Sequence, residues 1–267
     1  MSDHYHMPDK SLRKCKYWWF DAWDWLVNSA IRYMGPSEIS LSREELAMDP
    51  HIHTLYSHCS ISQPQQIIRR SVKLGFNAVA IMDHDDITGA LDTVCCAEYL
   101  KNEGIIPRDF LVIPGTEINS KAGHIGALFV EENFPAGLSP AETVRMIHEA
   151  GGLAIAVHPY HSTGIKEAVF DAPFDAVEVE CGSVFCRYSA KSSVDLTSDP
   201  RLKNMAKLGA SDAHYIQAIG SCYTILGTNK PTLESVKQAI IDGQSTAKTS
   251  MSCIRIRKML GRFHKLG

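Results

Sequence analysis

The sequence has little excess of charge of either sign. Its 267 residues include 27 lysines and arginines and 30 aspartates and glutamates, which gives a formal net charge of −3. This balance provides no global attraction to nucleic acid, although it is compatible with a local basic patch. The sequence also lacks an apolar run close to the roughly 20 residues that a membrane-spanning helix needs. We therefore expect a soluble protein, or at most one that binds a membrane surface.

The eight cysteines lack the paired spacing of a zinc ribbon. Cys95 and Cys96 are adjacent on an expected helix, where they cannot easily form a disulfide with each other. A secretory signal pattern is also missing from the first residues, so we expect reduced thiols and a cytoplasmic location. With 45% hydrophobic residues the chain can bury a substantial core, and one catalytic domain with short additions is the expected organisation.

Three segments differ in composition. Residues 1–48 carry all four tryptophans, and the three-four spacing of apolar residues from Trp19 to Met34 predicts an amphipathic helix. This N-terminal extension either packs on the domain as a lid or contacts a membrane surface or a partner protein. Residues 251–267 form a basic tail, which is either a solvated end or a contact for an acidic surface. Residues 49–250 form the expected catalytic domain.

The central region alternates short apolar runs with helical patterns, which is typical of a βα barrel or a doubly wound α/β sheet. Both folds collect their functional residues at the carboxyl ends of the strands. We favour a barrel, because its strand ends converge on one point from all sides. Helices are expected over residues 64–74, 87–102, 139–150, 199–207 and 231–242, and buried strands over 78–82, 110–114, 124–130, 152–157 and 174–180.

Two histidines one residue apart, His51 and His53, open the central region. In an extended segment the side chains at alternate positions share a face, so both imidazoles can reach one cation. Alone, such a pair is a weak signal. Because imidazole and carboxylate ligands suit Zn, Mn or Fe, a longer ordered series of them predicts a metal site. Further clusters do follow, mostly where an apolar run ends, and they are Asp83-His84-Asp85, Glu117, His124, His158 and Asp212-Ala213-His214.

These motifs in this order resemble those of the polymerase and histidinol phosphatase family, usually called PHP, over residues 49–250. The motifs are His-x-His, Asp-His-Asp, Gly-x-Glu, Ala-x-His-Pro and Ser-Asp-Ala-His, with His124 between the third and the fourth. The series is long and ordered, which makes the resemblance specific. It implies a distorted (β/α)7 barrel of the PHP type, two or three divalent metal ions and hydrolysis of phosphate esters.

Carried over by position, the resemblance implies three cations around a bridging carboxylate. A carboxylate can bridge two cations at about 3.5–4 Å, the spacing of two-metal phosphoryl chemistry. A water shared by the metals would be deprotonated near neutral pH and attack phosphorus in line, and the metals would neutralise developing charge. The implied ligands are His51, His53, Glu117 and Asp212 for the first metal, Glu117, His124 and His158 for the second, and His84, His214 and His58 for the third.

The turn after His53 departs from the family pattern. Many relatives read Ser-Asp-Gly where this chain reads Ser57-His58-Cys59. His58 can replace the aspartate as a ligand of the third metal, but its reach and charge differ, so the occupancy of that site stays open. Cys59 could instead ligate a soft metal.

Three residues are candidates for acting on the substrate itself. His161 would donate a hydrogen bond to a phosphate or act as a general acid. Asp85 would orient an imidazole or protonate the leaving group. Arg187 is the best-placed residue to grip a phosphate bidentately. Glu178 and Glu180 are expected to support the site or to pair with basic groups.

The leading interpretation is a metal-dependent phosphoesterase, a hydrolase acting on a small phosphorylated metabolite, a nucleotide or an oligonucleotide end. A deaminase or other amidohydrolase-like barrel also uses His-x-His with later histidine and aspartate, often with a bridging lysine where this chain has Glu117. A third interpretation is a non-catalytic, metal-stabilised module that docks on a partner through the N-terminal helix and the basic tail. The size of the ligand set argues against a loss of activity.

Overall fold

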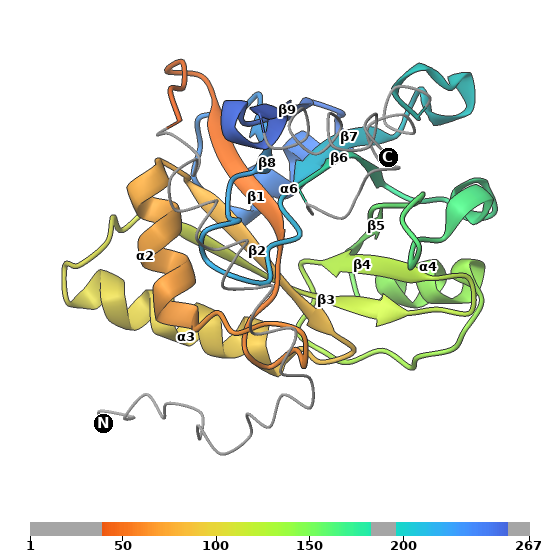
Figure 1. Cartoon of the computed structure of the whole chain (residues 1–267), viewed down its shortest axis with the longest axis horizontal. Helices are drawn as coiled ribbons and strands as arrows, with labels where there is room; N and C mark the ends of the chain where they lie inside the picture. The colour runs from red at the N-terminus through yellow and green to blue at the C-terminus, as the bar shows by residue number, and fades with distance from the viewer. Residues whose placement is uncertain (1–38, 183–195, 256–267) are drawn as a thin grey trace, which may run out of the picture.

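The structure, a computed structural model, describes residues 39–182 and 196–255 (Figure 1). The expected N-terminal helix, Arg187 and most of the basic tail lie outside these residues. The described elements are β1 (Leu46–Ile52), α2 (Pro64–Leu74), β2 (Ala78–His84), α3 (Thr88–Asn102), β3 (Leu111–Asn119), β4 (His124–Leu128), α4 (Pro140–Glu149), β5 (Leu153–Ala156), η2 (Lys166–Phe170), β6 (Ala176–Cys181), η3 (Pro200–Leu202), β7 (Ala206–Ala210), β8 (Cys222–Leu226), α6 (Leu233–Ile241) and β9 (Ser245–Thr249).

One sheet with the strand order β7-β6-β5-β4-β3-β2-β1-β8-β9 organises the chain. β1, β2 and β3 pair in parallel, as do β5, β6 and β7, whereas β4 is antiparallel to both of its neighbours. These six parallel strands therefore run in one direction, and their carboxyl ends form one rim. Because β4 runs the opposite way, its first residue lies at the same rim.

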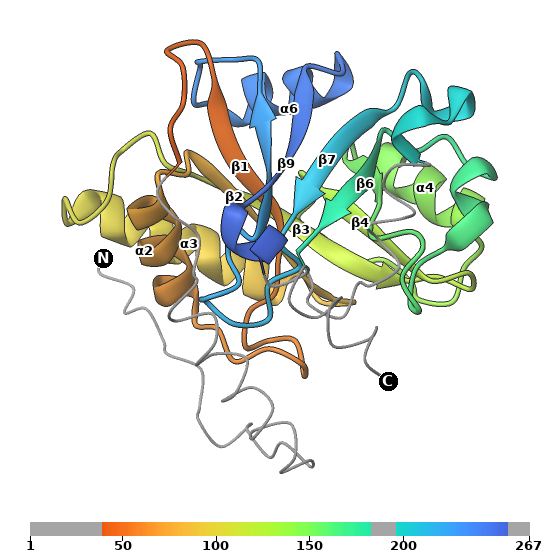
Figure 2. The same ribbon diagram turned by 45° about the horizontal axis from the view of Figure 1, so that its top comes forward.

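The sheet curls until β7, at one edge, meets β1 and the β8–β9 hairpin, so that the barrel is nearly closed (Figure 2). Ile52 and Ala213 form a parallel bridge, and the backbone N–H of His53 donates to the carbonyl of Ala213 at 2.9 Å. Gly209 permits the close approach of β8, because a Cβ there would lie 2.5 Å from the carbonyl oxygen of Tyr223. We call this junction of β7 with β1 and β8 the seam.

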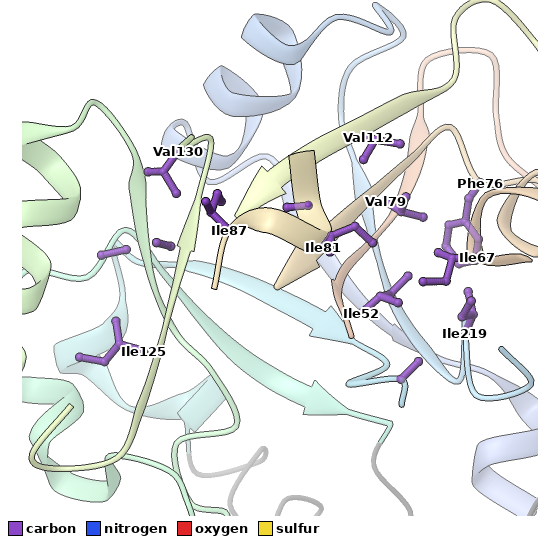
Figure 3. Packing of buried hydrophobic residues seen from close by; sticks show 14 of the residues in the cluster. Ile52, Ile67, Phe76, Val79, Ile81, Ile87, Val112, Ile125, Val130 and Ile219 are labelled. Atoms are coloured by element: carbon purple, nitrogen blue, oxygen red, sulfur yellow. The ribbon is translucent and has the colours of Figure 1, made fainter. Parts of the chain in front are cut away.

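Side chains of the strands alternate between two buried clusters. In β2, Val79 and Ile81 pack with Ile67 of α2 outside the sheet (Figure 3), whereas Ala80 and Met82 belong to the inner cluster. In successive views α2 and α3 lie together on one side of the barrel and α4 on the other (Figures 1 and 2). The alternation of small and branched apolar residues thus builds a barrel wall covered by helices on its outer face.

A register shift in β1 decides where the first histidine pair points. Met48 belongs to the inner cluster, but Ile52, four residues later, packs in the outer one. The pairing of β1 with β2 shifts between Asp49 and Ile52, and such an irregularity reverses which alternate residues face inwards. His51 and His53 consequently lie on the inner face.

Most expected helices and strands are confirmed, and local signals explain their ends. Pro64 occupies the first turn of α2 and Gly75 ends it with a φ of 87°. Ser139 caps α4 by accepting from the backbone N–H of Glu142. The helix expected over 199–207 is wrong, because only the short η3 forms there and β7 begins at Ala206. Among the described residues, no helix has the length and apolar character needed to span a bilayer.

Candidate metal centre

The side chains that the sequence predicts as ligands gather at one rim of the barrel. The rim is formed by the carboxyl ends of β1, β2, β3, β5 and β7 and by the start of β4. The structure places there His51 and His53 at the end of β1, His58 in the following turn, His84 at the end of β2, Glu117 in β3, His124 at the start of β4, His158 after β5, and Asp212 and His214 after β7.

The first group joins β1 to the segment after β7. His51 Nε2 lies 3.0 Å from His53 Nε2, and Asp212 Oδ1 lies 3.6 Å from the former atom and 3.3 Å from the latter. One ligand atom from each of these three residues falls within 4.8 Å of the others. Two imidazoles and a carboxylate at such separations can share one Zn, Mn or Fe ion.

The hydrogen bonds of the two imidazoles orient their Nε2 atoms towards each other. His51 Nδ1 faces Glu178 Oε1 at 2.9 Å, and a carboxylate only accepts, so Nδ1 carries the hydrogen. His53 Nδ1 faces Ser57 Oγ at 3.2 Å, and that hydroxyl donates its own hydrogen to Asp83 at 2.6 Å. Both Nε2 lone pairs therefore converge, an arrangement that needs a proton or a metal ion between them.

The pKa values of this pair follow from the same arrangement. Burial lowers the pKa of His51, but the charges of Glu178, Glu117 and Asp212 outweigh it and raise that pKa well above its usual value. Burial and then the charge of His214 lower the pKa of His53 to about 3. The two imidazoles thus hold one proton between them in the absence of metal, and a cation would take its place.

Glu117 occupies the position of a bridging ligand. Its Oε1 lies 2.8 Å from His124 Nδ1 and 2.9 Å from His158 Nε2. Its Oε2 lies 3.0 Å from His84 Nδ1 and 3.4 Å from His53 Nε2, and it makes no hydrogen bond to any described residue. Burial raises the pKa of Glu117, but the charge of His51 and the hydrogen bonds of its partners hold it well below the usual range. A buried anionic oxygen without a hydrogen bond fits a cation.

A third group lies on the outer side of the first. Ligand atoms of His53, Cys59, His84 and His214 fall within 4.8 Å of one another, and the group includes Cys59 rather than the neighbouring His58. The exposed His58 has its ring centroid 5.7 Å from that of His84. Within the turn, the Ser57 N–H donates to the carbonyl of Thr54, and the Ser60 N–H donates to the carbonyl of Ser57. The tight turn brings Cys59 back towards the rim, which the residue types alone do not indicate.

The three candidates for acting on the substrate have different surroundings. The ring centroid of His161 lies 5.4 Å from that of His158, at the edge of the centre. The oxygens of Asp85 accept from the backbone N–H of Asn119 at 2.8 Å and from its side-chain amide at 2.5 Å, which suits a positioning role at the end of β3. Arg187 lies outside the described residues.

Sequence reasoning missed the residues that hold the imidazole of His53, which are Ser57 and Asp83. The buried Asp83 accepts from the backbone N–H of Thr54 at 2.7 Å, from the Thr54 hydroxyl at 2.5 Å and from Ser57 Oγ. Burial raises the pKa of Asp83, although the hydrogen bonds from Ser57 and Thr54 oppose this. The signal was the pair of hydroxyl residues that follow His53, next to an aspartate that precedes His84.

The fold and this donor set define a class of protein, and the sequence identifies the family. The chain belongs to the PHP domain family, whose profile matches residues 49–208, more than half of the chain. A second profile, described as PHP-associated, matches residues 201–245. Family membership together with the cluster of imidazoles and carboxylates supports a metal-dependent hydrolase.

Two relatives are uncharacterized proteins of Methanocaldococcus jannaschii. The chain is 38% identical to MJ1587 over 143 residues, which cover 49% of this chain and 79% of that protein. It is 24% identical to MJ0417 over 188 residues, which cover 67% of this chain and 69% of that protein. The names of these relatives assign no activity.

Solved structures share the fold at low sequence identity. A two-domain protein of Bacteroides vulgatus containing a predicted PHP-like metal-dependent phosphoesterase matches with a TM-score of 0.60 and 17% identity, over 84% of this chain and 73% of that one. PsfC of Pseudomonas syringae matches with a TM-score of 0.57 and 15% identity, over 83% and 98%. Endonuclease Q in complex with a duplex that carries an abasic lesion matches with a TM-score of 0.52 and 18% identity, over 77% and 58%. The PHP-type barrel is thereby confirmed.

Proposed function

We propose that the protein is a phosphoesterase that hydrolyses a phosphate ester of a small metabolite, a nucleotide or an oligonucleotide end. The observation that carries the proposal is Glu117, a buried carboxylate with two imidazoles close to its Oε1 atom and three close to its Oε2 atom. A carboxylate so placed is suited to bridging two cations.

The residues divide into two ligand sets around Glu117. We assign His51, His53 and Asp212 to one ion and His124 and His158 to a second, with Glu117 shared by both. When bound, Zn, Mn or Fe ions would supply Lewis-acid activation of water and neutralisation of phosphoryl charge. The protein's own part is to hold these groups in a buried site, where electrostatic interactions act more strongly than in water.

Other residues of the chain act on proton positions and on the substrate. Glu178 and Ser57 keep the hydrogens of His51 and His53 on Nδ1, so that both Nε2 atoms stay free for a ligand role. His161, at the edge of the centre, is our candidate for donating a proton to the leaving oxygen. Arg187 stays a prediction for the grip on phosphate.

The candidate substrates follow from the lengths of the connections between strands and from a protein that shares the fold. Most connections between the described strands are short, which leaves little room for a separate substrate-covering domain and favours a small substrate. Endonuclease Q, which shares the fold, is described in complex with a DNA duplex. An oligonucleotide end therefore stands beside a small metabolite as a candidate.

The proposal is tested by removing metal with a chelator, restoring Zn, Mn or Fe separately, and measuring phosphate release from a panel of mono- and diesters. His51→Ala and Asp212→Ala should each lower kcat by at least about 10²-fold, because each removes a ligand. His148→Ala is the matched control, since His148 is a partly exposed histidine of α4 paired with Asp175, which precedes β6 and so lies at the amino end of that strand. Release of ammonia from amide or amine substrates, with no phosphate release from any ester, would support an amidohydrolase instead.

A further inference from the structure

The outer group at the rim combines sulfur with nitrogen. It consists of Cys59 in the turn after β1, His84 at the end of β2 and His214 after β7, with the ring of His53 beside them. The ring centroids of His53 and His214 are 4.3 Å apart, and those of His53 and His84 are 4.7 Å apart. Segments distant in the sequence thus bring three imidazoles and a thiol to one point.

His53 is committed to the inner group. Its Nδ1 is hydrogen-bonded to the Oγ atom of Ser57. Its Nε2 lies 3.3 Å from Asp212 Oδ1 and 3.4 Å from Glu117 Oε2. One lone pair serves one ion, so an outer ion would be left with the thiol of Cys59 and the imidazoles of two other histidines.

His214 is oriented for this role. Its Nδ1 lies 2.9 Å from the carbonyl oxygen of Asp212, a group that only accepts, so Nδ1 carries the hydrogen and Nε2 carries the lone pair. This second bond of a ligating imidazole to a carbonyl is the usual way in which a metal-binding histidine is held.

The thiol lies in a field that favours a cation. The negative charges of Asp212 and Glu117 act on the thiol of Cys59. The same charges attract a divalent ion, and a thiol that coordinates such an ion loses its proton. The side chain stays accessible at the rim, so the ion can enter from solvent.

We propose that Cys59 is a thiolate ligand of an outer metal ion, which it binds together with His84 and His214, and that it makes this position selective for zinc over manganese and magnesium. Thiolate ligands select soft ions, whereas manganese and magnesium prefer oxygen. Three protein ligands would leave one position of a tetrahedral zinc ion open to water or a substrate oxygen. The inference deepens the proposed function, because the outer position belongs to the same centre.

Cobalt substitution tests the sulfur ligand directly. Thiolate bound to Co²⁺ gives charge-transfer absorption in the near ultraviolet, which nitrogen and oxygen ligands do not give. The metal-free full-length protein, titrated with Co²⁺, should develop this absorption, and Cys59→Ser should abolish it. Cys95→Ser is the matched control and should retain it, because Cys95 is an exposed cysteine of α3. Absorption that is missing from the unmodified protein, or that survives in Cys59→Ser, overturns the proposal.

A second variant separates ligation from folding. Cys59→Asp replaces sulfur with oxygen, so it should lose the absorption, retain the outer ion by elemental analysis, and shift the preference of that position from Zn towards Mn. An unchanged Zn preference in this variant would count against the thiolate. The cobalt absorption and the metal preference are both measured without substrate. A negative result in either one is therefore independent of whether the protein releases phosphate. A protein that hydrolyses esters but lacks the absorption would retain the proposed function and lose this inference.

Discussion

Glu178 Oε1 lies 2.9 Å from His51 Nδ1, and the other carboxylate oxygen of Glu178 accepts the backbone N–H of His158 at 2.8 Å. Both side chains of the first pair are fully buried. A single carboxylate of β6 therefore fixes the proton of His51 in β1 and the backbone of His158, which follows β5. Glu178 therefore links the two candidate ligand sets on either side of Glu117.

Glu178→Gln should lower zinc affinity by about 10–100-fold while the fold is retained. The amide can no longer accept from both partners, so either the His51 hydrogen is moved to Nε2 or the His158 backbone loses its acceptor. A zinc titration against a competing chelator measures the effect. Glu98→Gln, on the exposed face of α3, is the control. An unchanged affinity in Glu178→Gln would contradict the assigned role.

Ser57→Ala should destabilise the metal-free protein by about 1–3 kcal/mol, because it leaves buried groups without a partner. The hydroxyl lies between His53 Nδ1 and Asp83 and also accepts the backbone N–H of His84. Urea unfolding in a chelator measures the change, and Ser40→Ala, at an exposed position, is the control. Equal stability of the two variants would show that this link contributes little.

The metal-free protein should lose a stabilising contribution of His158 as the pH rises. Burial lowers the pKa of His158, but the hydrogen bond and charge of Glu117, with Asp212 and Glu178, raise it from 6.5 to about 9. The folded state binds the proton of His158 more tightly than the unfolded state does. This contribution to stability is therefore complete below pH 6.5 and disappears as the pH passes about 9. Unfolding of the protein and of His158→Gln should therefore differ most near pH 6 and least above pH 9.

The sign reverses for metal binding. Zinc must displace the proton from His158, so zinc affinity should rise as the pH increases towards about 9, with release of protons. Calorimetry in two buffers of different ionisation enthalpy counts the released protons. A pH-independent affinity would mean that the imidazole is already neutral in the metal-free protein.

Gly209→Ala should weaken the seam by about 1–3 kcal/mol, since its Cβ would meet the backbone oxygen of Tyr223. Gly227→Ala is the matched control, because a Cβ there lies at ordinary contact distance, 3.5 Å from the Cβ of Gln244. Denaturant midpoints of the two variants make the comparison. If both variants are equally stable, the close approach of β7 and β8 is not a constraint.

The parts of the fold that the sequence predicts are those with strong local signals. The bounds of α2 follow from Pro64 and Gly75, and the buried strands follow from short apolar runs. β7 and the β8–β9 hairpin escape prediction because their pairing depends on the closure of the barrel, a contact between distant segments. The residue types thus predict where a helix or strand forms better than they predict which strands pair with each other.

The candidate site shows the same division. His51 and His53 can be recognised from their spacing, yet their inward direction depends on the register shift in β1. In the outer group, the ligand atom close to the imidazoles comes from Cys59 and not from the neighbouring His58. This depends on the path of the turn, which the residue types around it do not specify. Asp85 resembles a catalytic acid in the sequence, but its bonds to Asn119 are visible only when β2 and β3 lie side by side.

The closure of the sheet also brings together the candidate ligands His51, His53 and Asp212. His51 lies in β1 and His53 directly follows it, whereas Asp212 follows β7, on the far side of the seam. An ion held by all three would fasten the first strand of the barrel to the last of its parallel strands. The complete ligand set therefore forms only when the barrel closes. Before β1 and the segment after β7 come together, the protein cannot offer all three ligands to one ion.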